Sequence, residues 1–339
     1  MVPAPDLAAW LRGASATFVT TLAGLAFETI PFLLMGTLLS AIIQSFVPDR
    51  ALRRIFPKNR YLSILAALVV GVFVPICECG TVPLARRLRQ KGLPLSTAVA
   101  FLLAAPLANP MTIVSTFVAF KGTGYPVFAL RLGFGLAAAF AIAMIVDLVS
   151  RNRPSIDLAE PARRFASLRP TALPDPPRLP LALAWRRAEQ RAARRGSFGE
   201  GFVTRVSETL EHASYDFLDT ARYLIAGISI AAFARALVPA GAILSSLGKP
   251  LTATGTGLAS AYILSLCSTA DAFVARSLFA PDSYRAVLAF LMLGPMIDLK
   301  NTVLLSRFIR PKLLVALVVL SFLVVGIVTF IAYPLLEAS

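Results

Sequence analysis

The chain has 339 residues, of which 57% are hydrophobic and only 15% are charged, and its mean hydropathy is +0.74. Soluble proteins carry about 25% charged residues, so the composition excludes an ordinary globular protein and predicts a chain that crosses a membrane several times. The net charge of +15 comes mostly from arginines between the apolar runs, as is typical of cytoplasmic loops, and no basic domain interleaved with aromatic residues indicates nucleic-acid binding.

The N-terminal sequence MVPAPDLAAWLRGAS lacks the basic region and apolar core of a cleavable signal peptide. We therefore expect the first span to act as an uncleaved insertion signal. A spanning helix is predicted over residues 28–47, where Pro31 is tolerated because it lies near the start. A shorter apolar run, 61–76, follows and ends at a cysteine motif.

This motif, Cys77-Glu78-Cys79-Gly80, has two thiols one residue apart. Thiols are soft ligands that suit Cu(I), Zn(II) or trivalent arsenic. Where the backbone leaves the regular helix, as Gly80 permits, both sulfurs can reach one atom. The motif predicts that Cys77 and Cys79 bind a thiophilic centre, and the alternative is that they fill gaps as small apolar side chains.

The rest of the first half contains an arginine-rich short helix (81–91), a run broken by proline (95–118) and a final span (125–149). Asn109 lies three residues after Pro106 within the broken run. A proline break exposes polar backbone, so Asn109 is a candidate substrate ligand. The alternative is that it caps the half-helix that follows.

A proline- and arginine-rich segment, 150–197, separates this half from the next. We predict a solvated cytoplasmic linker with one short basic helix against anionic headgroups. The second half, 198–339, then presents the same parts in the same order. They are an amphipathic lead-in helix and the apolar runs 219–238, 253–266, 284–306 and 312–334.

Three blocks of the two halves match at nearly constant spacing. Pro48 and Pro239 are 191 residues apart, Cys77 and Cys267 are 190 apart, and Pro106 and Pro295 are 189 apart. Chance does not readily produce three such blocks in one order. We infer a gene duplication, with a first membrane repeat over 1–149, a linker over 150–197 and a second repeat over 198–339.

The second copy of the cysteine motif contributes Cys267, Asp271 and Arg276, and Asp298 is the counterpart of Asn109. Cys267 and Asp298 therefore join the predicted substrate-binding residues. As with Asn109, the alternative for Asp298 is a helix cap.

Acidic residues at membrane depth usually mark ion or proton pathways, so Glu78 and Asp271 are candidates for proton coupling or gating. The alternative is that they pair with Arg86 or Arg276, or lie in a turn at headgroup level. Arg86 and Arg276 recur at one repeat position. They either lie at the membrane surface or reach inward for anionic cargo.

The distribution of positive charge decides between two topologies. Four full crossings per half place the basic loop 48–60 outside, against the positive-inside rule. If the run that ends at Cys77 enters and returns instead, loop 48–60, the 81–91 helix, the linker and segment 307–312 all lie inside. Each half then crosses three times, so we favour inverted repeats with re-entrant breaks at the cysteine motifs over parallel repeats.

Several absences narrow the function. The chain lacks a phosphate-binding GxxxxGK[ST] loop, an HExxH motif and a CxxC motif, and it has a single histidine, His212. No histidine metal site or thioredoxin-like redox centre is therefore expected. Nothing in the sequence calls for a cofactor.

The pattern P-x-C-x-C-G-x-V-P-L-A-R-x-L-x-x-K-G-x-P over residues 75–94, followed by A-F-L-L-A-A-P-x-x-N-P over 100–110, resembles the bacterial predicted-permease family that includes the organoarsenical efflux permeases (ArsP-like). The segment L-G-P-M-I-D-L-K-N over 293–301 is also similar to the family. The resemblance covers essentially the whole chain. It implies a multi-pass permease of the cytoplasmic (inner) membrane and, in the characterised branch, trivalent organoarsenical cargo.

Together these observations predict an all-α polytopic membrane protein that is a secondary transporter and not an enzyme. It would export a small thiophilic or metalloid solute through a midplane cysteine site, with membrane lipids as its surroundings. The alternatives are a permease for a soft metal ion or a sulfur compound, and a membrane-embedded thiol enzyme.

Overall fold

The structure is a computed structural model, and it describes residues 7–46, 56–57, 59–74, 76–121, 125–152, 200–237, 250–279 and 283–337. Every regular element within these ranges is an α-helix. Six of the helical segments are long and apolar enough to cross a membrane, three in each predicted half. The prediction of an all-α polytopic membrane protein is therefore confirmed.

Within the described residues, six helices come from each predicted half, in the same order. The first six are α1 (Leu7–Phe46), α3 (Arg60–Phe73), α4 (Glu78–Gln90), α5 (Leu95–Ala108), α6 (Pro110–Ala119) and α7 (Tyr125–Asn152). The second six are α10 (Glu200–Leu237), α12 (Pro250–Leu264), α13 (Asp271–Leu278), α14 (Tyr284–Met296), α15 (Leu299–Ser306) and α16 (Pro311–Glu337).

The core lies around α5 and α14, which contact each other at the centre of the molecule. Every residue of α5 is buried, and α14 is buried from Ala286 to Met296. A helix that is apolar on all sides belongs in an interior, because no polar face is left for water. In each half, the neighbours of this central helix match: α3 and α7 flank α5, and α12 and α16 flank α14.

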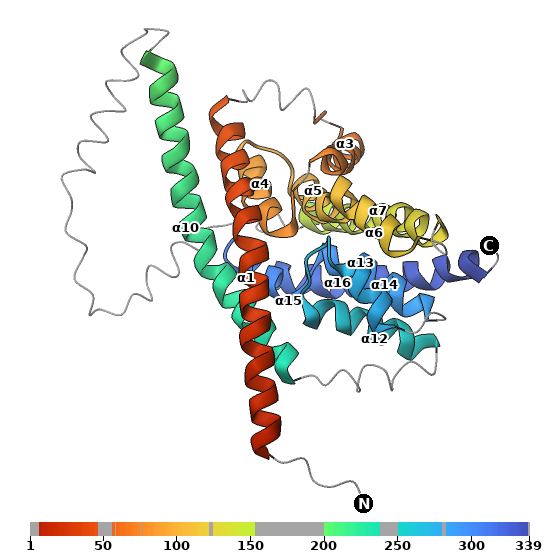
Figure 1. Ribbon diagram of the computed structural model, residues 1–339. Helices are drawn as coiled ribbons and strands as arrows, with labels where there is room; N and C mark the ends of the chain where they lie inside the picture. The colour runs from red at the N-terminus through yellow and green to blue at the C-terminus, as the bar shows by residue number, and fades with distance from the viewer. Residues whose placement is uncertain are drawn as a thin grey trace, which may run out of the picture.

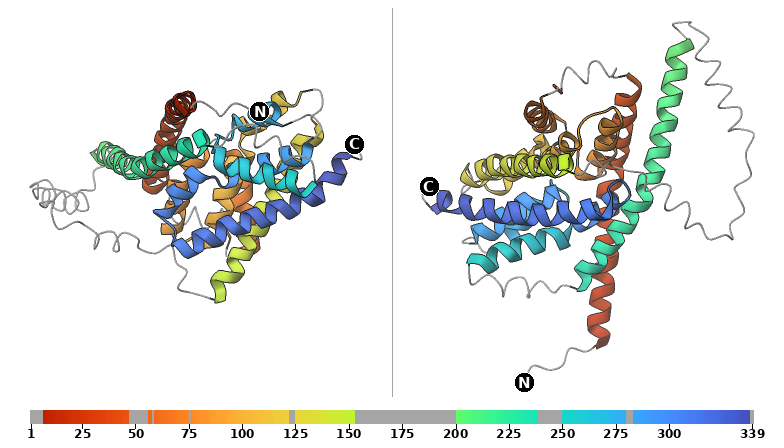
Figure 2. Two further views of the ribbon diagram at one scale, coloured as in Figure 1. Left: turned by 90° about the horizontal axis from the view of Figure 1, so that it is seen from below. Right: turned by 180° about the vertical axis from the view of Figure 1, so that it is seen from behind.

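Helices α1 and α10 pack side by side and run across one end of the bundle that the other helices form (Figure 1). They are antiparallel: α1 rises from the N-terminus while α10 descends, and the view from behind agrees (Figure 2). This direction fits halves of opposite orientation.

The predicted starts of the two halves need correction. We expected a separate lead-in helix before each first span, but α1 and α10 are continuous over 40 and 38 residues. No glycine–proline or polar turn interrupts either helix, so nothing ends the first segment. Pro31 accordingly lies in the interior of α1 and not near its start, a position that membrane helices tolerate.

The other boundaries agree closely with the sequence predictions. The apolar runs 61–76 and 253–266 end before the cysteine motifs as α3 and α12. The predicted 81–91 helix is α4, but it begins three residues earlier, at Glu78, so Cys79 and Gly80 lie in its first turn and the expected non-helical backbone of the motif is limited to Cys77. The two runs broken by proline are each split into two helices, α5–α6 and α14–α15. The linker 150–197 and its predicted basic helix lie almost entirely outside the described residues.

Candidate functional site

The first-half break lies between α5 and α6 at Asn109. Pro110 forces the preceding residue out of the helical region, and Asn109 has φ −69° and ψ 154°. Its side chain accepts a hydrogen bond from the Thr112 amide at 2.8 Å, so it caps α6. Its amide also donates to the carbonyl of Ile76 at 3.4 Å, which ties this break to the cysteine motif of the same half.

The second-half break lies between α14 and α15 at Asp298, which is fully buried. Asp298 caps α15 by accepting a hydrogen bond from the Asn301 amide at 2.6 Å. The capping alternative therefore describes both Asn109 and Asp298. Beyond its cap, Asp298 presents Oδ2 to the ammonium of Lys300 at 2.8 Å.

The segment between α12 and Cys267 contains a residue with an unusual backbone conformation. Ser265 directly follows α12 and has φ 48°, the left-handed region that residues other than glycine rarely adopt. Its carbonyl and that of Leu266 accept hydrogen bonds from the Lys300 Nζ at 2.9 and 3.1 Å. The conformation costs about 1 kcal/mol or more and persists only where such contacts fix it.

The three cysteines lie in one buried cluster. Cys77 and Cys79 come from the start of α4, Cys267 comes from the segment before α13, and all three are free thiols. The remaining members of the cluster are apolar side chains of the two long helices: Leu25 and Leu33 from α1, and Leu224, Ile228 and Ala231 from α10. The α1–α10 pair therefore covers thiols that both halves supply.

Lys300 connects the two halves beside these thiols. Its Nζ lies 2.6 Å from Glu78 Oε1 on α4 and 2.8 Å from Asp298 Oδ2, and all three side chains are buried. With the carbonyls of Ser265 and Leu266, the ammonium has four acceptors around it. A buried charge is stable only when it is paired in this way.

Asp271, at the start of α13, is paired with Arg131 of α7. The two nitrogens of Arg131 lie 3.1 and 2.5 Å from the Asp271 oxygens, and Arg131 also donates to the Thr116 hydroxyl at 2.7 Å. Like Glu78, Asp271 lies in the first turn of a helix after a cysteine motif. Each of the two acids is thus paired with a cation from the opposite half.

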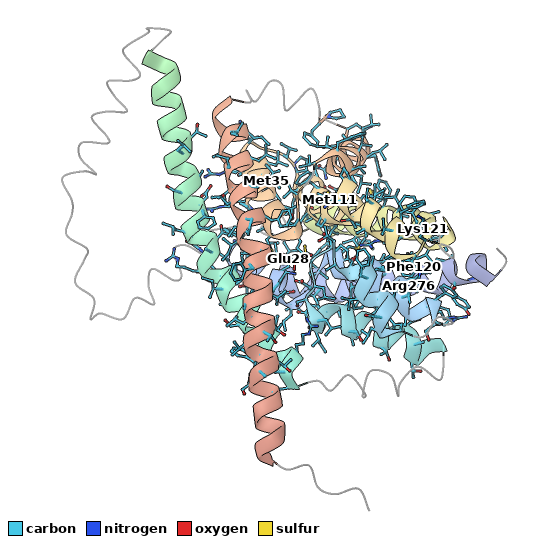
Figure 3. All side chains as sticks on the ribbon, viewed as in Figure 1. Glu28, Met35, Met111, Phe120, Lys121 and Arg276 are labelled. Atoms are coloured by element: carbon cyan, nitrogen blue, oxygen red, sulfur yellow. The ribbon has the colours of Figure 1, made fainter. Side chains whose placement is uncertain are left out.

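Arg86 and Arg276 are partners of neither acid. The Arg86 guanidinium lies 5.0 Å from the centroid of the Phe308 ring. Arg276 donates to the carbonyl of Ala119 at 2.8 Å, at the end of α6, where Figure 3 labels it close to Phe120. Both contacts join one half to the other, so the alternative pairing of the acids with these arginines is wrong.

Some buried oxygen atoms of the site have no hydrogen-bond partner. Among the described residues these include Glu78 Oε2, Ser268 Oγ beside Cys267, and Asn301 Oδ1 beside Lys300. Buried acceptors normally have partners, because leaving one empty costs about 1–3 kcal/mol. The site therefore offers unfilled hydrogen-bonding capacity next to the thiols. In the same part of the chain, no group of three or more His, Cys, Asp or Glu side chains is arranged to hold a metal ion.

Two glycines at matching repeat positions allow the long helices to pack closely against the short helices α4 and α15. A Cβ on Gly36 of α1 would collide with the backbone of Gly80, two residues from Glu78. A Cβ on Gly227 of α10 would lie 2.7 Å from the carbonyl oxygen of Lys300. Each long helix thus packs against the start of the short helix that carries one partner of the Glu78–Lys300 pair, α1 against α4 and α10 against α15.

Lys300 and Arg131 were not among the residues that the sequence singled out. Arg131 lies inside the predicted final span of the first half, and Lys300 lies two residues after Asp298 in the broken run. A charged residue within an apolar span is a functional candidate by default, and this signal could have identified both.

Comparison with known proteins places this arrangement in a family. The predicted-permease family matches residues 15–333. The chain belongs to this predicted-permease family. UPF0718 protein YcgR of Bacillus subtilis (strain 168) is 32% identical over 291 residues, which cover 86% of this chain and 88% of that protein.

A Streptococcus mutans (serotype c, strain ATCC 700610 / UA159) protein named "Putative two-component membrane permease complex subunit" is 32% identical over 299 residues, 88% of this chain and 89% of that protein. UPF0718 protein YraQ of Escherichia coli (strain K12) is 29% identical over 139 residues, 39% of each chain. No solved structure gives a significant match. Family membership and the six candidate spans identify a multi-pass bacterial membrane protein of the permease type.

Proposed function

We propose that this permease is a secondary transporter that exports a small thiophilic solute, with trivalent organoarsenicals as the cargo class. The observation that carries the proposal is the buried cluster of Cys77, Cys79 and Cys267, to which both halves contribute. A site between two halves can face either side of the membrane in turn, and inverted-repeat transporters bind their cargo at such interfaces.

The chemistry of such a cargo fits the thiols. In an organoarsenical of the form R–As(OH)₂, each thiol replaces one hydroxide on arsenic: an S–As bond forms, an As–O bond breaks, and the thiol proton leaves with the hydroxide as water. Arsenic stays trivalent, so no oxidant or reductant is needed. The reverse exchange with water releases the cargo, which lets a transporter bind and release at one site.

The surrounding residues have distinct roles in this proposal. Asn109 and Asp298 hold the two breaks in shape and line the site through their caps. Glu78 and Asp271 are the proton-coupling residues, each next to a cation of the opposite half. Arg86 and Arg276 each contact the opposite half, and their role in the proposal is to gate the path to the site. The chain acts by transport and not by catalysis.

The test is uptake of methylarsenite into everted membrane vesicles that contain the protein, compared with uptake of Cu(I) and thiosulfate. We expect methylarsenite to accumulate, and Cys77→Ser with Cys79→Ser to reduce its uptake to the level of empty vesicles. A Ser277→Cys substitution, which adds an exposed thiol on α13 away from the cluster, should not restore uptake in a chain without its own cysteines.

Other outcomes would replace the proposal. Uptake of copper or thiosulfate in place of methylarsenite would assign the same site to a soft metal ion or a sulfur compound. Methylarsenite uptake that survives both serine substitutions would show that the thiols do not bind the cargo.

A further inference from the structure

Arg86 on α4 is a half-buried cation without a carboxylate partner. Its guanidinium contacts the face of Phe308, at 5.0 Å from the ring centroid. Among the described residues, none has a carboxylate within ion-pair distance of it. A guanidinium in an apolar setting needs an anion or several hydrogen-bond acceptors, so the position of Arg86 leaves its charge unneutralised.

The acids near Arg86 are already engaged. Asp216 of α10 pairs with Arg87, and Asp219 pairs with Arg222 and Arg307. Arg86 lies outside the six candidate spans, and burial lowers the pKa of its guanidinium, an effect that Asp216 and Asp219 oppose and that Arg87 and Arg307 increase. A further anion next to Arg86 would therefore be stabilised.

An apolar crevice opens beside this guanidinium. It lies between α4 and α5 of the first half and the end of α15 with its connection to α16 in the second, and it is a shallow, half-open crevice whose empty space, including the part open to the surroundings, is about 350 Å³. Apart from Arg86 itself, its lining consists of apolar side chains, among them Ala98, Leu102, Leu305 and Ile309. A crevice with apolar walls and one cation matches an amphiphile with an apolar chain and an anionic head.

The location of the crevice also fits a lipid. The contact between Arg86 and Phe308 brings the basic end of α4 next to segment 307–312, which holds Arg307, Arg310 and Lys312. The distribution of charge predicts that both basic segments face the cytoplasm. Basic pockets between helices on that side are where anionic headgroups bind.

We propose that this crevice, at the seam between the halves, binds an anionic phospholipid, with one acyl chain along the apolar wall and the phosphate on Arg86. The lipid would neutralise Arg86 and bridge α4, α5 and the α15–α16 connection. It would thereby couple the packing of the two halves to the charge of the surrounding membrane.

The experiment is native mass spectrometry of the full chain in detergent with phosphatidylglycerol, phosphatidylcholine of the same acyl chains, or inorganic phosphate. We expect phosphatidylglycerol alone to remain bound and to raise the thermal midpoint. Arg86→Leu should weaken the binding of phosphatidylglycerol about tenfold, since a hydrogen bond to a charged group contributes an affinity of roughly this size. Ala98→Leu, which narrows the crevice and keeps the charge, should weaken it as well.

The matched control is Arg276→Leu, because Arg276 lies at the same repeat position on α13 and is exposed; it should leave lipid binding unchanged. Equal retention of phosphatidylcholine would refute recognition of the charge. Displacement of phosphatidylglycerol by inorganic phosphate would assign Arg86 to a free anion. Displacement of phosphatidylglycerol by methylarsenite would make the crevice part of the cargo path. If the Arg86→Leu variant bound phosphatidylglycerol as well as the unmodified protein, the lipid would bind elsewhere.

Discussion

Lys300 occupies the repeat position that Met111 holds in the first half, 189 residues earlier. Met111 is 59% exposed, whereas Lys300 is fully buried between Glu78 and Asp298. The duplicated motif has thus become asymmetric, with the cation in one half and the thiol pair in the other. The stability of the protein is sensitive to substitution in this group of three side chains, because removing one of them leaves the other two charged and buried.

We predict that Lys300→Met lowers the free energy of unfolding by about 3–5 kcal/mol, because Glu78 and Asp298 would then face each other without a cation. The measurement is the thermal midpoint of the purified protein in detergent. Adding Glu78→Gln and Asp298→Asn to Lys300→Met should recover most of the loss, since no buried charge then remains unpaired.

The comparison variant is Arg60→Met, which breaks the ion pair between Arg60 and Asp147 at 3.2 Å. The Arg60 side chain is 47% exposed, and although the Asp147 side chain is only 6% exposed, it keeps the hydrogen bond that Ser96 donates to it. Because water screens the Arg60 end of this pair, Arg60→Met should lower the midpoint by less than Lys300→Met. If Lys300→Met lowered the thermal midpoint no more than Arg60→Met, the buried ion pairs of Lys300 would not contribute to the stability of the fold.

How far the sequence predicts this site depends on the residue. The breaks at Asn109 and Asp298 followed from proline positions and the repeat, because local backbone rules act within a few residues. The pairings did not follow. Glu78 and Lys300 are separated by 222 residues and Arg131 and Asp271 by 140, and such contacts depend on how the two halves pack, which no local pattern encodes. Arg276 seemed a partner for Asp271 only because it is near in sequence.

At the scale of the helices, the long pair α1–α10 also has features that the sequence predicts and others that it does not. Its apolar spans were predictable from composition, but its continuity was not, because an amphipathic segment before a span is also typical of a separate helix at the membrane surface. The close contacts at Gly36 and Gly227 explain why these helices carry glycine at matching positions. A side chain there would push α1 from the start of α4, or α10 from the start of α15.

We predict that Gly36→Ala and Gly227→Ala each lower the free energy of unfolding by about 1–3 kcal/mol, the usual effect of an overpacked contact. Both should also increase the rate at which a maleimide reagent labels the covered cysteines, because the α1–α10 pair would no longer seal the cluster. Labelling rates and thermal midpoints in detergent measure the two effects.

Gly24→Ala in α1 and Gly255→Ala in α12 are the controls, since a Cβ at either position meets no atom within 4 Å. These variants should keep the midpoint or raise it slightly, as alanine favours helix over glycine. Faster labelling in the controls than in the Gly36 and Gly227 variants would show that these contacts do not cover the thiols.

At the scale of the whole molecule, the orientation of the two halves relative to the membrane determines how the site can open to each side. The antiparallel run of α1 and α10 favours inversion (Figure 1), and so does the distribution of positive charge. Lys121 and Arg310 give the sharpest comparison, because they are matching residues 189 apart, just after α6 and α15. Inverted halves place them on opposite sides of the membrane, and parallel halves place them on the same side.

We predict that, in a chain without its own cysteines, Lys121→Cys reacts with a membrane-impermeant maleimide in intact cells and Arg310→Cys reacts only in everted vesicles. The exposed positions of both residues make the thiols reachable, and Figure 3 shows Lys121 at the end of the bundle away from the α1–α10 pair. Lys58→Cys should behave like Arg310→Cys, because loop 48–60 is predicted to be cytoplasmic. Labelling of both Lys121→Cys and Arg310→Cys from one side would require parallel halves. The thiol cluster would then join two copies of one site that face the same way, and alternating access by exchange of the two halves would have to be abandoned.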